Sequence, residues 1–281
     1  NMNTKKEIVD KTYFLLGEDQ SATVFDKEGE VIPELNTTID EICRCKVSNI
    51  NTGQAIKGGM LDFLVREKRI KVWRPIVLSK EIDEDSTEIE VNTTDKIPET
   101  WALCINGNII KYDGKDEKRL HNVVWINGIH EVGSQILPAF EIKDEVIKLH
   151  DVIDDRTHLP MIYRDYREEA LGECYTIKSL RGRKYVVFHN YEWIVTLSMT
   201  VKLEIMENDD DECGFPDEYG VNILPYLVAG RLLINTSEVA KGKELLAIGY
   251  NKLEDMYSFY ATPSKPWRKT IKSKTLKLNH W

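Results

Sequence analysis

The sequence predicts an α+β protein. We expect a helical bundle core built from the N- and C-terminal thirds, an inserted and mainly antiparallel β domain, and an extended C-terminal arm. Three observations predict this arrangement. Apolar residues recur with the helical period near both ends of the chain, whereas the middle consists of short runs with period two that are separated by turn residues. The last segment, residues 264–281, fits neither pattern and carries basic residues without any acidic one.

Length and composition favour an ordered protein. The 281 residues are 42% hydrophobic, enough for one large domain or two smaller ones. The net charge of -9 favours solubility and argues against a body that binds nucleic acid over its whole surface. No apolar run is long enough to span a bilayer and the start is not typical of a signal peptide, so we expect no membrane partner. Five cysteines without a regular spacing indicate reduced thiols in a cytoplasm.

Three helices are predicted in the N-terminal part. Residues 5–16 carry apolar side chains on one helical face. Residues 34–50 repeat this period, with Thr37 or Thr38 available as the N-cap. A shorter helix is predicted over residues 54–68, although two adjacent glycines interrupt it.

From about Trp73 the period changes to two, which indicates β-strands. Asn106-Gly107 and Asp113-Gly114 follow such runs and are typical of tight turns, because Asn, Asp and Gly tolerate the positive φ angles that these turns need. Short strands are expected within residues 88–91, 101–105, 108–112, 123–126 (before Asn127-Gly128), 146–149, 175–180 (before Arg181-Gly182), 185–189 and 193–205.

The helical period returns after an acidic loop. One helix is predicted around residues 221–233, with Pro225 in its first turns, and a longer one from Ser237 to about Tyr260. Their apolar stripe favours a core position, with the tyrosine hydroxyls reaching water or a neighbouring subunit. The residues expected to pack the helices are Leu224, Leu227, Leu246, Tyr250, Leu253 and Tyr257.

These patterns divide the chain into four parts: residues 1–72 and 215–262 as the two halves of the helical core, 73–214 as the β domain, and 263–281 as a basic arm. The arm carries six basic residues, which leaves -15 on the rest of the chain. It lacks a periodic apolar face, so we expect it to be mobile in the isolated protein and ordered against a partner. The residues expected to contact that partner are Trp267, Arg268, Lys269, Ile271, Lys272, Lys274, Leu276, Lys277 and Trp281.

No motif of catalysis or cofactor binding is recognisable. Cys43 and Cys45 are two residues apart on a predicted helix and would point in different directions, and the six histidines are scattered. The acidic loop at residues 209–212 is more typical of a solvated tip than of a cation site. Phosphate-binding glycine loops and nucleophile elbows are absent from the sequence. We therefore expect no enzyme activity, no cofactor and no metal ion.

Two phrases of the sequence carry a resemblance to a known family. The first runs from Ile97 to Gly107 and contains, in this order, a proline, an acidic residue, a predicted strand and an Asn-Gly turn. The second joins Phe215–Tyr219 to Leu224–Leu233 and then to Gly249–Tyr257. Together with the order of elements, these phrases resemble the adaptor or connector proteins that lie beneath the portal of tailed bacteriophages.

The resemblance implies a non-enzymatic structural protein of the virion neck, made in the host cytoplasm. Family members form rings, usually of twelve copies, bind the portal protein through a C-terminal arm, and present another face to tail or collar proteins. Genomic DNA would pass through the lumen without specific binding, which suits an acidic body. Ala229 and Gly230 are small enough to allow the close helix approach that neighbouring subunits in a ring require.

Three other functions remain open from the sequence. The chain could be another tail, collar or fibre-attachment protein of a phage, since these combine helices and strands in the same way. It could bind nucleic acid through the basic arm. The β region could instead serve as a carbohydrate- or cation-binding accessory domain.

Overall fold

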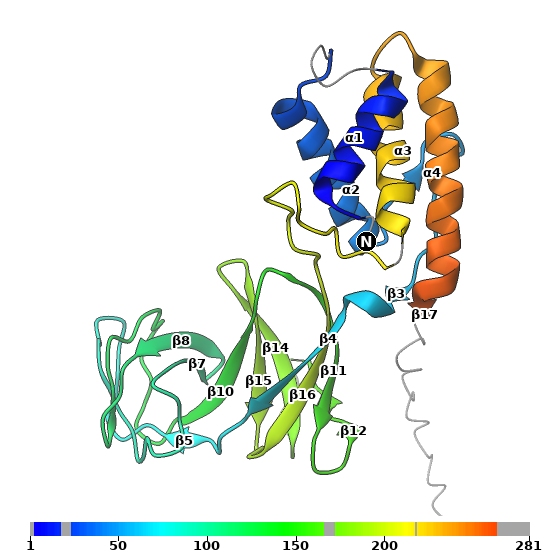
Figure 1. Ribbon diagram of the computed structural model, residues 1–281. Coiled ribbons are helices and arrows are strands. Elements are labelled where there is room, and N and C mark those ends of the chain that lie inside the picture. Colours follow the sequence, from blue (N-terminus) through cyan, green and yellow to red (C-terminus); the bar gives the residue numbers. More distant parts are fainter. Residues whose placement is uncertain (1–2, 18–23, 166–171, 217, 263–281) are drawn as a thin grey trace, which may run out of the picture. The chain divides into compact units, whose positions relative to one another are not determined.

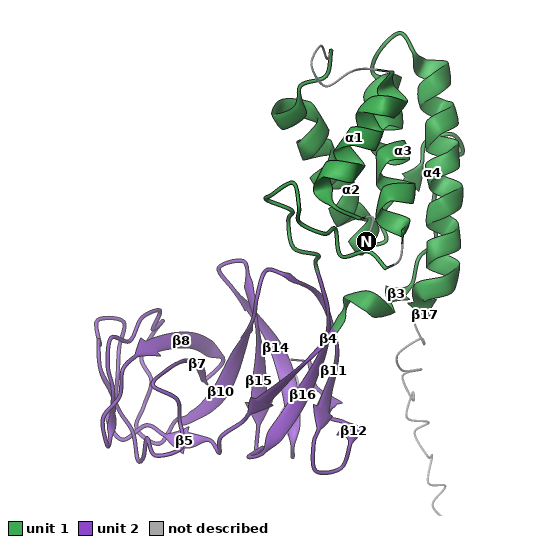
Figure 2. Ribbon diagram, in the orientation of Figure 1, with its two compact units in different colours: residues 1–65, 202–281 green, residues 66–201 purple. Residues whose placement is uncertain are grey.

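The chain forms two compact units (Figures 1 and 2). The computed structural model describes residues 3–17, 24–165, 172–216 and 218–262. The helical unit comprises residues 1–65 and 202–281, and the β unit comprises residues 66–201. Both ends of the chain contribute to the helical unit, and the C-terminal helix pair packs against the N-terminal helices. An α+β protein with helices, then antiparallel sheets, then helices is therefore confirmed.

Helix α1, Lys5–Leu16, follows the sequence prediction. Thr4 is its N-cap, and its side chain and that of Glu7 form a reciprocal capping box. Gly17 ends the helix with a φ of 81°, a left-handed conformation that glycine adopts without steric cost. The buried face includes Ile8, Val9, Thr12, Tyr13 and Leu16.

Helix α2, Ile32–Cys43, begins and ends earlier than predicted. A π-helical turn, η1 (Lys27–Val31), leads into it, and Pro33 occupies its first turn. Thr37 and Thr38 are therefore interior residues, and the prediction of a threonine N-cap is wrong. The Thr37 hydroxyl instead donates to the Pro33 carbonyl one turn earlier. The helix stops at Cys43, so Cys45 lies beyond it with a φ of 52°.

The helix predicted over residues 54–68 is wrong. This segment contains β2 (Gln54–Ala55), β3 (Met60–Leu61), a 3₁₀ turn η2 (Asp62–Leu64) and the start of β4 (Val65–Lys71). β2 pairs with β1 (Ser48–Asn49), and β3 pairs with β17 (Ala261–Thr262), close to the other end of the described chain. The β1–β2 hairpin is local, whereas the pairing of β3 with β17 is a tertiary contact, and both replace the weak helical period of a segment that two glycines already interrupt.

Helices α3 (Tyr219–Ile234) and α4 (Val239–Tyr260) run side by side (Figure 1). They approach closely at Gly230 and Gly242: a Cβ atom on either glycine would lie 2.9 Å from the carbonyl oxygen of the other. Pro225 is an interior residue of α3 and not part of its first turn, because the helix begins at Tyr219. The small residues that the sequence suggested for contact between subunits, Ala229 and Gly230, are buried within this chain.

The β unit contains two main sheets. The larger follows the order β13-β14-β15-β10-β7-β8, with β5 also paired to β10, and the smaller follows β12-β11-β16-β4. β13 and β14 pair in parallel, whereas β5, β7 and β15 pair antiparallel with β10, and the pairs β14–β15, β7–β8, β11–β12 and β11–β16 are also antiparallel. The strand bounds are β5 Ile76–Val77, β6 Ile89–Glu90, β7 Thr100–Ile105, β8 Asn108–Asp113, β9 Arg119–Leu120, β10 Gln135–Ile142, β11 Val146–Asp154, β12 Leu159–Pro160, β13 Ile162–Tyr163, β14 Cys174–Leu180, β15 Arg183–His189 and β16 Ile194–Val201.

The hairpin predictions are confirmed at two of the four expected turns; Asp113-Gly114 and Asn127-Gly128 do not join paired strands, since β9 pairs with β6 and no strand ends at Ile126. Asn106-Gly107 joins β7 to β8 and Arg181-Gly182 joins β14 to β15, with positive φ angles at all four residues. The strand predicted over residues 123–126 is wrong, since only Val124 makes an isolated bridge there, to Lys111.

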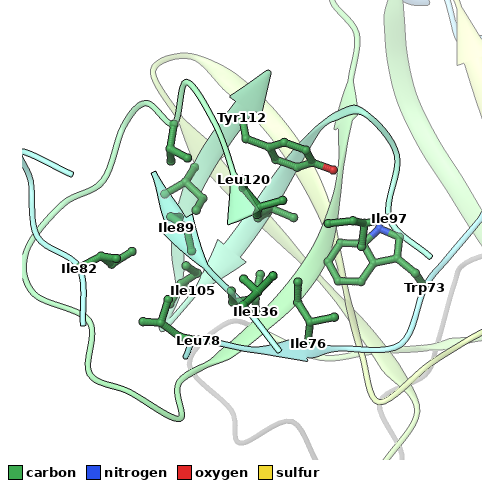
Figure 3. Close-up of a cluster of buried hydrophobic side chains, with 14 residues drawn as sticks. Trp73, Ile76, Leu78, Ile82, Ile89, Ile97, Ile105, Tyr112, Leu120 and Ile136 are labelled. Atoms are coloured by element: carbon green, nitrogen blue, oxygen red, sulfur yellow. The ribbon is translucent and has the colours of Figure 1, made fainter. Parts of the chain in front are cut away.

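Two large hydrophobic clusters and a smaller third one build the interior of the β unit. One lies between the smaller sheet and strands β10, β14 and β15, and includes Phe188, Tyr191 and Leu197. The other gathers side chains from the β5–β9 region around Ile136 of β10, with Trp73 and Ile97 at one end (Figure 3). The loops and short strands of the β5–β9 region thus have their own hydrophobic core.

Residues 202–214 belong to the helical unit and not to the β unit, in contrast to the boundary drawn from the sequence. Lys5 and Lys6 at the start of α1 donate backbone hydrogen bonds to the carbonyls of Asp211 and Asp209. The Cys213 backbone N–H donates to the Asn3 carbonyl. The segment has no apolar period, so the sequence alone could not assign it to either unit.

Candidate functional site

The basic arm, on which the sequence hypothesis depends, lies outside the described residues. This applies to all nine residues expected to contact a partner, from Trp267 to Trp281. Candidate surfaces must therefore be sought in the helical unit and in the β unit, each by itself.

The six residues expected to pack the helices are all buried. Leu224 and Leu227 on α3 are inaccessible to solvent, as are Leu246 and Leu253 on α4. Tyr250 and Tyr257 are buried to a similar degree. These side chains form the interior of the helical unit, so none of them is available to a ligand or to another subunit.

The hydroxyls of the two tyrosines bind the N-terminal part of the same chain. Tyr257 donates to the Ile42 carbonyl at 3.0 Å, and Tyr250 accepts from the Ile50 backbone N–H at 3.3 Å. Burial raises the pKa of both phenols above the usual range. The suggestion that these hydroxyls reach water or a neighbouring subunit is therefore wrong.

An ion-pair cluster fixes α3 to α2. The Arg231 guanidinium lies 2.9 Å from a Glu34 carboxylate oxygen and 2.5 Å from one of Glu41, and it also donates to the Thr38 hydroxyl. Its side chain is only 15% exposed. A charge buried to this degree needs such partners, so Arg231 has a structural role.

The cysteines show no arrangement for chemistry. Burial raises the pKa of Cys43, Cys104 and Cys213 to about 11, which keeps these thiols protonated and unreactive at neutral pH. The Cys45 thiol lies 3.1 Å from the Gly59 carbonyl oxygen. Within the described ranges, no three His, Cys, Asp or Glu side chains are grouped in a way that could hold a metal ion.

The acidic loop is held together by its own contacts. Asp211 accepts hydrogen bonds from the backbone N–H groups of Asn208 and Glu207, at 2.8 and 2.9 Å. These bonds, the one from Asn208 first, lower its pKa below the usual range. Asp209 pairs with Lys27 at 3.4 Å. The loop therefore has the geometry of a structured turn.

The β unit contains a large cavity of about 870 Å³, which is in the range of ligand-binding pockets. Its lining is mainly polar. Cationic and anionic side chains meet three side-chain amides, those of Asn92, Gln135 and Asn190. The charged residues that line it are Arg74, Asp95, Lys96, Arg156, Glu173 and Glu192.

A second cavity of about 570 Å³ shares two lining residues with the first, Lys96 and Glu192. The Lys96 Nζ atom lies 2.6 Å from a carboxylate oxygen of Glu192. Because both residues line both cavities, this ion pair lies where the two cavities meet. Trp193 lines the second cavity and is 52% exposed, although its backbone carbonyl accepts a short hydrogen bond from the Val72 N–H. The indole is thus presented to solvent from a fixed backbone.

A hydrogen-bonded network forms one wall of the first cavity. Asp154 accepts from the Arg156 guanidinium at 2.9 Å and from the Tyr191 hydroxyl at 2.7 Å, and Arg156 also bonds Glu173 at 2.7 Å. Asp154 is 7% exposed. Chiefly through the Arg156 hydrogen bonds, its pKa falls to about 2.

This shift predicts a pH dependence of stability. The folded state holds the Asp154 carboxylate with a pKa of about 2, below the ordinary 3.8, so its contribution is complete above pH 5 and is lost as the pH falls from about 4 to 2. We expect Asp154→Asn to lower the free energy of unfolding by about 1–2 kcal/mol at pH 7, and by about half as much at pH 3.

Urea unfolding of both proteins at the two pH values measures this difference. Asp144→Asn is the matched control, because Asp144 is exposed in the loop between β10 and β11. An equal loss for Asp154→Asn at pH 7 and pH 3 would show that the charge of Asp154 is not what stabilises the wall.

Comparison with known proteins gives no relative. No family model matches the sequence, and no curated protein matches it.

In the part of the chain that the structure describes, no helix combines the length and apolar character that a bilayer span requires.

Sequence reasoning missed the two cavities. Their lining comes from the region of β4 and β5, the loop before β7, β10, the residues Arg156 and Glu173, and the segment from residue 190 to 194, which are far apart in sequence. The only local signal was the phrase Tyr191-Glu192-Trp193, in which two aromatic residues flank an acid at the start of a strand. Such a phrase is as typical of a core strand as of a binding surface.

Proposed function

We propose that this chain is a structural virion protein that forms the connector, or adaptor, ring between the portal and the tail of a tailed bacteriophage. One observation carries the proposal: the two ends of the chain fold together into one helical unit, with the β unit inserted between them. This is the organisation that the resemblance implies.

The phrases that carry the resemblance support the proposal by their position. The phrase from Phe215 to Tyr257 forms helices α3 and α4, which pack along their glycines, and α1 packs against α3. The phrase from Ile97 to Gly107 forms β7 and the tight turn into β8. Both phrases therefore build the framework of this fold.

The charge distribution suits a ring through which DNA passes. Residues 1–263 carry -15 and would repel the phosphate backbone, so that DNA crosses the lumen without being held. The basic arm has the opposite sign. In this proposal it binds an acidic surface of the portal, with Trp267 and Trp281 as apolar anchors.

Electron microscopy of the purified chain, alone and mixed with portal rings, tests the proposal. We expect closed rings with a central channel, of about twelve copies according to the resemblance, that stack on one face of the portal. Mass photometry measures the copy number independently. A chain that stays monomeric at every portal concentration, or that binds isolated tail or collar proteins but never the portal, would contradict the connector assignment.

A further inference from the structure

The two cavities of the β unit offer an exposed aromatic ring beside a cluster of cations. Trp193 presents half of its surface to solvent at the second cavity. Lys71 and Lys96 line the same cavity, and Arg74 lines the adjoining one. An indole face binds flat rings with apolar C–H surfaces, while the neighbouring ammonium and guanidinium groups bind anionic oxygens.

The cationic side chains near the junction of the two cavities outnumber the acidic side chain nearest to them, that of Glu192. Glu192 pairs directly with Lys96, and the charges of Arg74 and Lys71 act on the same carboxylate and contribute to its lowered pKa. Taken together, the two cavities are lined by four cationic residues (Lys71, Arg74, Lys96 and Arg156) and three acidic ones (Asp95, Glu173 and Glu192). This leaves positive charge for a ligand anion beside the Trp193 ring.

The lining of the first cavity points to a ligand rich in hydroxyl groups. Amides from Asn92, Gln135 and Asn190 can each donate and accept, and the carboxylates of Asp95 and Glu173 can only accept. Hydroxyl groups satisfy both kinds of partner. Phosphodiester oxygens, in contrast, offer acceptors alone and cannot donate hydrogen bonds to these carboxylates.

A buried donor lies at the same place. Trp73 lines the second cavity, is 3% exposed, and its indole N–H has no hydrogen-bond partner among the residues that the structure describes. Its ring lies beside Ile97, which lines the first cavity (Figure 3). The nitrogen atom itself is inaccessible to solvent, so this donor is a cost within the folded protein and not a contact for a ligand in the cavity.

We propose that these adjoining cavities bind an acidic oligosaccharide. One sugar ring stacks on the exposed indole of Trp193. A carboxylate of the saccharide binds the cluster of Lys71, Arg74 and Lys96. Hydroxyl groups of the next sugar extend past the Lys96–Glu192 ion pair into the larger cavity. The inference does not depend on the connector assignment, because every residue that it uses lies in the β unit.

Calorimetric titration of the full chain with tetragalacturonate, an acidic oligosaccharide, tests the proposal. We expect binding that Trp193→Ala weakens about tenfold or more, since aromatic stacking together with the lost contact area approaches that free energy. Lys71→Gln should weaken it as well. The matched controls are Phe14→Ala, an exposed aromatic residue of the helical unit, and Lys184→Gln, an exposed lysine of β15 that lines neither cavity. Both should bind like the parent chain.

Two further ligands distinguish the alternatives. Neutral chitotetraose should bind more weakly than tetragalacturonate; equal binding would overturn the role of the cations. An octathymidylate oligonucleotide should not compete. If the oligonucleotide alone binds, and Trp193→Ala abolishes that binding, the groove recognises nucleic acid and the saccharide proposal is wrong. Absence of tetragalacturonate binding at millimolar concentration, or unchanged binding by Trp193→Ala, would overturn it as well.

Discussion

Replacing Leu253 with aspartate is expected to unfold the helical unit. Leu253 lies on α4 and is inaccessible to solvent. Loss of a buried leucine costs about 2–5 kcal/mol, and an ionised carboxylate without a partner at the same place adds several kcal/mol. The sum approaches the whole stability of an ordinary domain, about 5–15 kcal/mol. The helical far-UV circular dichroism signal of the variant should therefore be strongly reduced.

Asn251→Asp is the matched control for this variant. It adds the same charge to the same helix two residues earlier, but Asn251 is exposed. Its urea midpoint should stay close to that of the parent chain, since surface substitutions usually change stability by less than about 0.5 kcal/mol. A soluble Leu253→Asp protein with the parent midpoint would show that the α4 stripe is not essential to the core.

Deletion of residues 264–281 is expected to abolish attachment to the portal while leaving the fold intact. The deleted segment contributes no periodic apolar face, and ordering it costs roughly 1–2 kcal/mol per residue for the backbone alone. A partner surface must offset that cost. Cosedimentation with portal rings should show no binding by the truncated chain, and phage particles made with it should contain packaged heads without the connector.

Two variants separate the contribution of the tryptophans of the arm from that of its basic residues. Trp267→Ala with Trp281→Ala removes the apolar anchors but keeps all six basic residues, whereas changing the six basic residues to glutamine keeps the anchors. If charge contributes, binding by the parent chain should weaken as salt rises, and the glutamine variant should lose this dependence. A truncated chain that still joins portal rings normally would contradict the assignment of the arm. If deletion instead removes a steeply salt-dependent affinity for DNA, the arm is a nucleic-acid-binding segment.

Local signals in the sequence were enough to predict several elements. The apolar face of α1 and its terminal glycine, the hairpin turns at Asn106-Gly107 and Arg181-Gly182, and the stripe of α4 all depend on residues within a few positions of one another. Backbone sterics and the period of 3.6 or 2 decide such features, so the order of helices and strands could be predicted.

Predictions failed where distant partners decide the local structure. Met60–Leu61 became a strand that pairs with the distant β17, and residues 202–214 joined the helical unit through the backbone of α1. The close approach of Gly230 and Gly242 likewise occurs between two helices of one chain, where the sequence had suggested contact between subunits. A single sequence does not show which segments meet.

The apolar period was sufficient to predict the α+β fold class, and the sequence itself shows that residues 264–281 are basic while the rest of the chain carries -15, because period and charge are properties of the chain before it folds. The contacts of the key side chains depend instead on how the chain folds. Tertiary packing placed the hydroxyls of Tyr250 and Tyr257 on the backbone of the N-terminal part and brought Trp193 beside Lys71 and Lys96. Cavities form where side chains from separate strands meet, and their position depends on packing in three dimensions, which no local pattern records.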